Sequence, residues 1–389
     1  MGDTDPITLV GGDSRTPYQR PPLSKGFLAG TLPEARLPLR GASFYADNDI
    51  ELVCGEWVDS VSLTDPASGA GRALTRSGRE LRFDRLALTV GGTPRRLEVA
   101  GNELPGIHYL RNVDDALALR VDLEAAERVV VVGGGFVGLE VAAVANSAGK
   151  KVTLVETTDR LIGRAVAPAV SFFFADAHRR RDIDVELGTS VSGFLGQDGV
   201  EGVRLADGRT IPADVVVVGI GLLPHTELAT QLGLTCAGGI VVDELGRTSV
   251  PGVVAAGDCT VLAHPIHGRL HLESVPNAIA QAKTAAASLL GEKRPDTGVP
   301  WFWSDQADLK LQIAGLSAGH DQVVLRGDPA TESFSALYYR DGRLVSIDAV
   351  NAPRDYMAVR RILERGGSVP PSTAADPSVP LKEFLEATA

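Results

Sequence analysis

The strongest constraint on the fold is one continuous segment in the middle of the chain. Four valines (Val129–Val132) lead into the glycine-rich turn Gly133–Gly138, the apolar stretch 136–148 follows, and a second β-branched run ends at Glu156. An all-valine run of this kind suits a parallel strand that is covered on both faces. The order strand, glycine turn, helix, strand therefore predicts a dinucleotide-binding βαβ unit.

The glycines of this turn, Gly133, Gly135 and Gly138, follow the spacing GxGxxG. They allow a tight turn, close approach of a pyrophosphate and close packing of helix on strand. The helix that follows offers free N–H groups to the phosphates. Glu156 lies about 20 residues further on, where a carboxylate accepts hydrogen bonds from a ribose diol and repels a 2′-phosphate. The complete pattern predicts an NADH site and argues against a glycine-rich turn without a ligand.

A near copy of the second strand of this unit lies close to the start of the chain. Residues 7–10 read Ile-Thr-Leu-Val, and residues 152–155 read Val-Thr-Leu-Val. In the middle copy a strand and a glycine loop come first, whereas the residues ahead of Ile7 contain neither. We therefore expect two dinucleotide-binding domains, the first of which lacks its opening strand and its phosphate loop.

Composition excludes several functional classes. A net charge of −11 argues against nucleic acid as the main partner. No apolar run reaches the length of a membrane span, and no signal-type stretch stands near the N-terminus, so a cytoplasmic protein is expected. The cysteines, Cys54, Cys236 and Cys259, form no CxxC motif. This disfavours a disulfide framework, a zinc site and a redox-active cysteine pair.

The C-terminal part of the chain has a different pattern. A segment rich in glycine and proline (291–300) predicts a linker. The strand-like runs after it cover residues 309–313, 322–325, 334–339 and 344–350, and a helix is expected at 354–365. This pattern predicts a small α+β domain. The Pro/Ser-rich tail from Gly366 to Pro380 is expected to be loose.

Five segments resemble one family of proteins. They are Tyr18–Lys25, Gly133–Glu140, Ala256–Cys259, Glu273–Ala278 and Trp301–Gln306. Together they resemble the FAD-dependent NADH–ferredoxin reductases of bacterial oxygenase systems, the putidaredoxin reductase type. The motifs also stand in the family's order. The stretches Pro-Pro-Leu-Ser-Lys and Trp-Phe-Trp-Ser-Asp-Gln are far more specific than the glycine motif.

The resemblance implies an α/β fold with two Rossmann-like dinucleotide-binding domains and a C-terminal α+β interface domain. The FAD-binding domain would be discontinuous, at residues 1–110 and 237–298. The NADH-binding domain would cover residues 111–236 and the C-terminal domain residues 299–389.

The resemblance also implies roles for individual residues. Lys25 would lie near the flavin and pair with Glu140, Trp303 would pack near the flavin on the route to the electron acceptor, and Asp258 would bind the ribityl chain. The other implied contacts are Arg20, Val58, Arg111 and Val275 at FAD, with Gly219 and Gly221 at NADH. Without the resemblance, Asp258 reads equally as a helix N-cap, Lys25 as a surface lysine and Glu140 as a solvated acid near a helix start.

Two departures from the family concern the FAD half. The missing strand and glycine loop are expected to weaken FAD binding and to expose part of the core. This points to a misplaced start codon or a truncated record. Gly12 also stands where the family has an acid after the second strand, which leaves Asp13 to approach the adenosine ribose from a shifted position.

The implied activity is electron transfer from NADH through FAD to a 2Fe–2S ferredoxin that feeds an oxygenase. A flavin accepts two electrons as hydride and can release them singly. The lack of paired cysteines argues against a disulfide reductase of related fold. Two alternatives stay open: a flavin reductase that serves rubredoxin, a quinone or oxygen, and a non-catalytic NADH-binding protein that has lost FAD.

Overall fold

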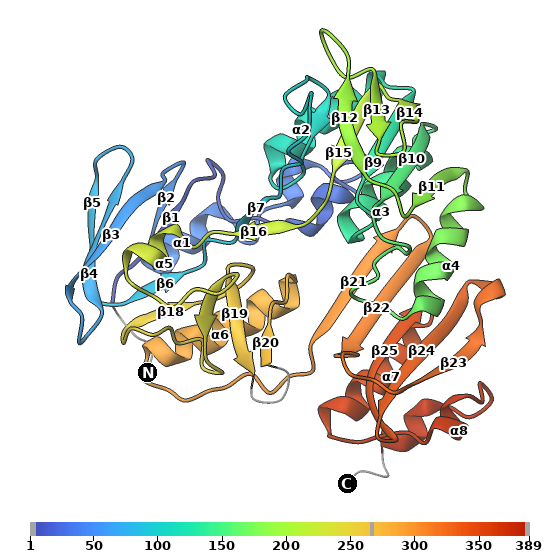
Figure 1. Ribbon diagram of the computed structural model, residues 1–389. Coiled ribbons are helices and arrows are strands. Elements are labelled where there is room, and N and C mark those ends of the chain that lie inside the picture. The colour runs from blue at the N-terminus through green and yellow to red at the C-terminus, as the bar shows by residue number, and fades with distance from the viewer. Residues whose placement is uncertain (1–4, 265–267, 386–389) are drawn as a thin grey trace. The chain divides into compact units, whose positions relative to one another are not determined.

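The chain forms two compact units, each built from three separate segments (Figure 1). The computed structural model describes residues 5–264 and 268–385. Unit 1 contains the chain up to Gln19 together with residues 35–93 and 222–298, and unit 2 contains residues 20–34, 94–221 and 299–389. The units divide near residues 93 and 222, and unit 2 includes the C-terminal region. This division into compact units does not test the expected domain boundaries at residues 110, 236 and 298, so these boundaries stay predictions.

Unit 2 contains a five-stranded parallel sheet in the order β11-β10-β9-β15-β8. The valine run forms the central strand β9, and all four of its valines are buried. This confirms the predicted fully covered parallel strand. The strands are β8 (Ile107–His108), β9 (Arg128–Val132), β10 (Lys151–Glu156), β11 (Ile183–Leu187) and β15 (Val215–Val218).

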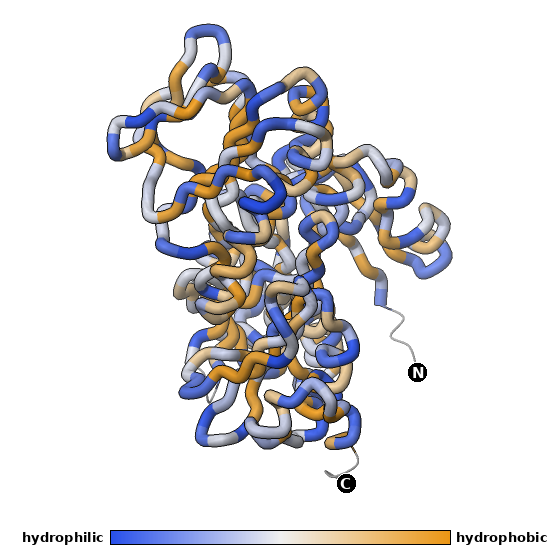
Figure 2. Tube along the Cα trace, turned by 90° about the vertical axis from the view of Figure 1, so that its right-hand side faces the viewer, coloured by the Kyte–Doolittle hydropathy of each residue, from blue (hydrophilic) through white to orange (hydrophobic). Residues whose placement is uncertain are grey.

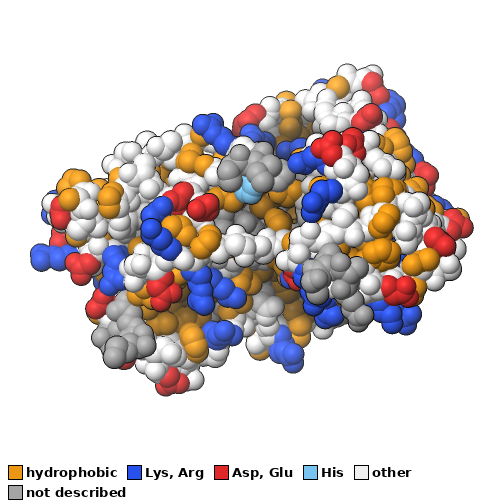
Figure 3. Space-filling model, turned by 90° about the horizontal axis from the view of Figure 1, so that it is seen from below, with side chains coloured by type: hydrophobic (Ala, Val, Ile, Leu, Met, Phe, Trp, Pro, Cys, Tyr) orange, Lys and Arg blue, Asp and Glu red, His pale blue; other side chains and the backbone are white. Residues whose placement is uncertain are grey.

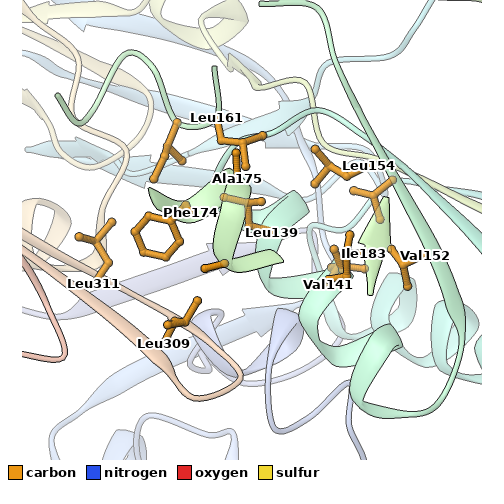
Figure 4. Close-up of a cluster of buried hydrophobic side chains, with 14 of the residues drawn as sticks. Leu139, Val141, Val152, Leu154, Leu161, Phe174, Ala175, Ile183, Leu309 and Leu311 are labelled. Atoms are coloured by element: carbon orange, nitrogen blue, oxygen red, sulfur yellow. The ribbon is translucent and has the colours of Figure 1, made fainter. Parts of the chain in front are cut away.

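Helix α3 (Phe136–Ser147) connects β9 to β10 and packs on both strands. Its end is marked by Gly149, which has a φ of +78°, a conformation that glycine adopts without a steric penalty. Leu139 of α3, Leu154 of β10 and Phe174 of α4 (Pro168–Arg179) meet in the largest buried cluster of the unit (Figure 4). The remaining elements here are α2 (Val113–Ala125) and an antiparallel sheet of β12 (Val191–Leu195), β13 (Gly202–Leu205) and β14 (Thr210–Pro212).

The C-terminal region is an antiparallel sheet of order β21-β22-β25-β24-β23 with α7 packed on it, which confirms the predicted α+β domain. Figure 2 shows apolar and hydrophilic segments alternating along the chain. Leu309, Leu311 and Phe334 of this sheet belong to the same buried cluster as Leu139 and Phe174. The elements are β21 (Trp301–Gln306), β22 (Leu309–Gly315), β23 (Gln322–Asp328), β24 (Ser333–Arg340), β25 (Arg343–Val350) and α7 (Pro353–Glu364).

The prediction of a loose tail from Gly366 to Pro380 was wrong. Val369 and Ala374 are fully buried, and α8 (Pro371–Ala374) lies within this segment. The buried guanidinium of Arg326 donates hydrogen bonds to the backbone carbonyls of Ala374, Asp376 and Val379. An arginine about fifty positions earlier therefore holds a segment whose own composition predicts a loop.

Unit 1 carries two separate pairs of parallel strands. β1 (Ile7–Gly11) pairs with β2 (Ile50–Cys54), and β18 (Val253–Ala255) pairs with β6 (Leu86–Leu88). The strand predicted at residues 7–10 is confirmed and ends one residue later. The other elements are α1 (Ala42–Asp47), β3 (Val58–Asp65), β4 (Ala70–Thr75), β5 (Glu80–Phe83), β7 (Gly92–Pro94), β16 (Leu222–Pro224), α5 (Glu227–Gln231), β17 (Ile240–Val242), β19 (Thr260–His264), β20 (Gly268–Leu270) and α6 (Val275–Leu289).

Candidate functional site

The glycine loop of unit 2 is packed too closely to admit side chains. A Cβ atom on Gly133 would lie 2.3 Å from the carbonyl oxygen of Gly219, and one on Gly138 would lie 2.1 Å from the carbonyl oxygen of Gly133. Gly133 also has a φ of +108°, which disfavours any other residue. Gly135 is the N-cap of α3, so the start of that helix faces the loop. The loop is therefore a backbone cradle at a helix N-terminus, the arrangement that binds phosphates.

Two further predicted residues lie beside this loop. Gly219 follows β15, and its N–H donates to the carbonyl of Val132 at 2.8 Å, which joins the ends of β15 and β9. Gly221 comes two residues later with a φ of +112°. The structure thus places both glycines at the carboxyl edge of the parallel strands, where dinucleotides bind in open α/β sheets.

Glu156 is held at the same edge by its own neighbours. One carboxylate oxygen accepts a hydrogen bond from the N–H of Gly134 at 2.7 Å, and the other accepts from the N–H and the hydroxyl of Thr158, each at 2.8 Å. An ionised carboxylate has about four acceptor positions. The orientation of Glu156 is therefore fixed while capacity remains for a ribose hydroxyl, so this loop fits a nicotinamide dinucleotide.

Lys25 and Glu140 form the predicted ion pair, with 2.7 Å between Nζ and Oε2. Lys25 follows a 3-10 turn that begins with two prolines, Pro21–Ser24, and Ser24 donates its hydroxyl to the same Oε2 at 2.5 Å. Glu140 is 4% exposed and the Lys25 side chain 20%. The interpretations of Lys25 as an ordinary surface residue and of Glu140 as a solvated acid were therefore wrong.

Residues that the sequence did not single out complete the surroundings of Glu140. Ser304 of β21 donates its hydroxyl to Oε1 at 2.7 Å, and Gln306 and His178 continue the contact behind it. Trp303 stands on the same strand next to Ser304 and stacks on Trp301, with ring centroids 5.5 Å apart. The resemblance gave a role in the motif Trp301–Gln306 only to Trp303, yet Ser304 of this motif contacts Glu140 and Gln306 contacts Ser304.

The residues expected at FAD are divided between the two units. In unit 2, Arg20 donates to the carbonyl oxygen of Arg111 at 2.6 Å, so these two lie together. In unit 1, Val58 begins β3, Asp258 follows the β18 strand and Val275 begins α6. A single flavin that contacts both sets stays a prediction. The N-cap of α6 is Ser274, whose hydroxyl accepts from Asn277, so Asp258 does not cap this helix.

A side chain at Gly12 would require Trp57 to move. A Cβ on Gly12 would lie 2.4 Å from the indole ring of Trp57. The next residue, Asp13, already accepts the hydroxyl of Tyr18 at 2.5 Å and the N–H of Arg15 at 3.1 Å. Trp57 therefore occupies the space of a side chain at Gly12, and Asp13 faces Tyr18.

The three cysteines are all free thiols. Cys259 is fully buried, and burial raises the pKa of its thiol, which disfavours the reactive thiolate. Among residues 5–264 and 268–385, no group of three or more His, Cys, Asp or Glu side chains is arranged to hold a metal ion. No helix in that described part of the chain is both long and apolar enough to cross a membrane.

Known proteins match this chain over nearly its whole length. The pyridine nucleotide-disulphide oxidoreductase family matches residues 3–282, and the reductase C-terminal family matches residues 301–385. A ferredoxin–NAD(P)(+) reductase of Sphingomonas sp is 42% identical over 97% of this chain and 91% of its own length. Putidaredoxin reductase of Pseudomonas putida is 40% identical over 98% of this chain and 91% of its own length.

Solved structures give the same result. A ferredoxin reductase from Rhodopseudomonas palustris superposes with a TM-score of 0.93 at 40% identity, covering 99% of this chain and 94% of that one. The covalent putidaredoxin reductase–putidaredoxin complex gives a TM-score of 0.92 at 40% identity, covering 98% and 92%. The predicted α/β class with two nucleotide-binding domains and a C-terminal α+β domain is confirmed. The chain belongs to the pyridine nucleotide-disulphide oxidoreductase family, in the group that contains the putidaredoxin-type ferredoxin reductases.

Proposed function

We propose that this protein passes electrons from NADH through FAD to a 2Fe–2S ferredoxin that feeds an oxygenase. The observation that carries the proposal is the arrangement in unit 2. The glycine loop and Glu156 lie at one edge of its sheet, and Lys25 pairs with Glu140 of the helix that starts there. Proteins of this family use FAD and NAD(P)H, and relatives of similar length are named as ferredoxin reductases.

The nucleotide loop supports NADH as the electron donor. The free N–H groups at the start of α3 receive the pyrophosphate, and the close packing of Gly133 on Gly219 sets how deeply the dinucleotide enters. Glu156 orients the adenosine ribose through its remaining acceptor position and repels a 2′-phosphate. These contacts bind and orient the donor.

The residues implied at FAD have chemistry that fits this cofactor. Arg20 and Arg111 supply positive charge for phosphates, Asp258 supplies an acceptor for ribityl hydroxyls, and Lys25 supplies a fixed ammonium. When bound, FAD accepts a hydride and releases electrons one at a time. The ion pair keeps Lys25 in one orientation, and Glu140 is shielded from water because it is only 4% exposed. No protein group needs to accept or donate a proton for hydride transfer itself.

The route out of the protein is proposed to pass Trp303. Buried Cys259 and the free thiols of Cys54 and Cys236 provide no disulfide relay. The electron therefore leaves for an external carrier. Trp303 is the aromatic residue of β21 next to Ser304, and it stacks on Trp301. The absence of a described membrane-spanning helix fits the proposed cytoplasmic setting. Figure 3 shows basic and acidic side chains interspersed over one face.

One observation favours rubredoxin as an alternative electron acceptor. A rubredoxin–NAD(+) reductase of Pseudomonas putida is 35% identical over 93% of this chain. The two proposals share the NADH and FAD steps and differ only in the carrier.

Reduction of cytochrome c separates these proposals. The 389-residue protein is supplied with FAD and NADH, and cytochrome c reduction is followed alone, with a 2Fe–2S ferredoxin and with a rubredoxin. We expect a large increase only with the ferredoxin. A larger increase with rubredoxin would favour the second acceptor. Tight NADH binding with no bound flavin and no reduction of any acceptor would leave only a non-catalytic NADH-binding protein.

A further inference from the structure

A chain of buried side chains continues inward from the Lys25–Glu140 pair. Oε1 of Glu140 accepts the hydroxyl of Ser304 at 2.7 Å, and Oγ of Ser304 accepts from Nε2 of Gln306 at 3.2 Å. Oε1 of Gln306 lies 2.8 Å from Nε2 of His178. Glu140, Ser304, Gln306 and His178 are at most 4% exposed. The chain thus connects α3, β21 and α4 within unit 2.

The charge of Glu140 determines the direction of every hydrogen bond in this chain. An ionised carboxylate only accepts, so the single hydroxyl hydrogen of Ser304 points to Oε1. Oγ of Ser304 must then accept, which requires the NH₂ group of Gln306 on that side. The carbonyl oxygen of Gln306 consequently faces His178, and Nε2 of His178 must carry a hydrogen. The carboxylate of Glu140 therefore sets the tautomer of His178, which lies three hydrogen bonds away along the network.

The burial of His178 agrees with this assignment. Burial lowers the pKa of its imidazole, so the ring is neutral and carries a single N–H. Nδ1 is the buried ring nitrogen without a hydrogen-bond partner in the structure. A buried N–H without a partner is more costly than a bare lone pair, because the donor loses its bond to water. The hydrogen therefore belongs on Nε2, where Gln306 accepts it.

We propose that Ser304, backed by Gln306 and His178, is a positioning residue that holds Glu140 and thereby fixes the ammonium of Lys25. Ser24 and Lys25 both contact Oε2, which leaves Oε1 without a partner unless Ser304 supplies one. Without that donor the carboxylate is held through Oε2 alone, so its orientation about the terminal bond is less restricted. Ser304 thus holds the ion pair from β21, the strand that also carries Trp303.

This inference rests on the proposed function only for its kinetic consequence. The network itself is independent of NADH, FAD and any carrier. Its direct readout is the tautomer of His178, which nitrogen NMR of the full-length protein reports. His178 is identified by the loss of its signals in His178→Phe. We expect the Nε2–H form in the wild-type protein.

Three variants test the positioning role. Ser304→Ala removes the donor, and Ser304→Thr keeps the hydroxyl. Ser335→Ala is the matched control, because Ser335 is also fully buried in the C-terminal sheet and donates to a carboxylate, Asp355, at 3.3 Å. In Ser304→Ala the amide of Gln306 loses its acceptor, so the His178 signals shift. In Ser335→Ala they stay unchanged.

The kinetic readout is the single-turnover rate of flavin reduction by NADH. A misplaced reacting group can cost about a hundredfold in rate. We expect Ser304→Ala to be about tenfold or more slower, with the dissociation constant for NAD⁺ changed less than about threefold. Ser304→Thr should recover most of the rate, and Ser335→Ala should keep the wild-type rate.

The Nδ1–H form of His178 in the wild-type protein would overturn the proposal. So would His178 signals in Ser304→Ala identical to those of the wild-type protein, or a flavin reduction rate matching that of Ser335→Ala. If the protein bound no flavin, the NMR readout alone would decide, and the proposed function would fail separately. If ferredoxin were not the carrier, both readouts would remain valid, because neither involves an acceptor.

Discussion

Two strands of nearly identical sequence have opposite environments in this molecule. In β10, which pairs with β9 and β11, Val152 and Leu154 are 2% and 0% exposed, and α3 packs on the strand. In β1, Ile7 and Leu9 are 56% and 37% exposed, and the strand pairs with β2. The same four-residue pattern is core in one unit and surface in the other. Burial therefore depends on the elements packed around a strand and not on the strand's own residues alone.

The central strand makes the difference between the two units. In unit 2, β9 joins the strands β10 and β11 to the strands β15 and β8 in one sheet. In unit 1 the parallel pairs β1–β2 and β18–β6 are separate sheets. Among the residues that the structure describes, no strand of unit 1 takes the place that β9 has in unit 2.

The largest expected effect compares the two copies directly. Leu154→Ala should lower the free energy of unfolding by about 2–5 kcal/mol, because it leaves a cavity in a packed core. Leu9→Ala, at the equivalent position, should lower it by less than about 1 kcal/mol, because its side chain already meets water. Urea denaturation, followed by a separate probe in each unit, measures both. Equal effects would show that the two strands are buried alike in solution.

A buried acid gives unit 2 a pH dependence. Asp348 is fully buried beside the hydroxyl of Tyr338, and desolvation raises the pKa of its carboxyl to about 7, from the ordinary 3.8. Between these values the folded state binds the proton more tightly than the unfolded state does. Its contribution to stability is therefore complete below about pH 4 and is lost as the pH rises through 7.

Asp348→Asn should remove this slope. A shift of one pKa unit corresponds to about 1.4 kcal/mol, so we expect the variant to be more stable than the wild-type protein at pH 8 by about 1–4 kcal/mol. At pH 5 the two proteins should differ much less. Denaturation profiles of unit 2 from pH 5 to 8 test this, with Asp321→Asn, an exposed acid, as the control. Parallel profiles for Asp348→Asn and wild type would contradict the assignment.

A smaller effect concerns the nucleotide itself. Glu156 ends β10, whereas Gly11 ends the matching strand β1. Glu156→Ser should weaken NADH binding by about tenfold, through the loss of a charge-assisted hydrogen bond, and should reduce the preference for NADH over NADPH. Fluorescence titration with both nucleotides measures the two changes. Glu186→Gln on the neighbouring strand serves as the control, and an unchanged preference in Glu156→Ser would contradict the role of Glu156.

The smallest expected effects concern exposed ion pairs, whose contributions to the free energy of unfolding should be equal in the two units. Arg79 of unit 1 pairs with Glu51 at 2.6 Å, and Arg209 of unit 2 pairs with Glu186 at 2.9 Å, all on the surface. Exposed pairs contribute about 0–1 kcal/mol because water and salt screen them. Arg79→Ala and Arg209→Ala should each lower the free energy of unfolding by no more than that. A clearly larger loss in one unit would show that its surface pair is less exposed than the structure indicates.

Local patterns in the sequence predicted the nucleotide-binding unit well. The valine strand, the glycine loop, α3 and β10 are adjacent in the chain, and their spacing carries the whole βαβ geometry. The ion pair of Lys25 and Glu140 was reached only through the resemblance to a family. These two residues stand 115 positions apart, and no pattern in either segment points to the other.

The missed features all depend on contacts between distant segments. Ser304 meets Glu140 across 164 positions, and His178 meets Gln306 across 128. A serine and a glutamine on a short aromatic strand give no periodic signal for such partners. The tail after Gly366 was misjudged for the same reason, because Arg326 supplies its donors from β23.

The central claim is that this chain moves electrons from NADH through FAD to a ferredoxin. Anaerobic stopped-flow spectroscopy tests it most directly. The protein is reconstituted with FAD, mixed with one equivalent of NADH and then mixed with an oxidised 2Fe–2S ferredoxin. We predict that NADH bleaches the flavin absorbance within the first mix, faster than NADPH does, and that the ferredoxin restores this absorbance in the second. A flavin that NADH does not bleach, or that ferredoxin does not reoxidise, would contradict the claim.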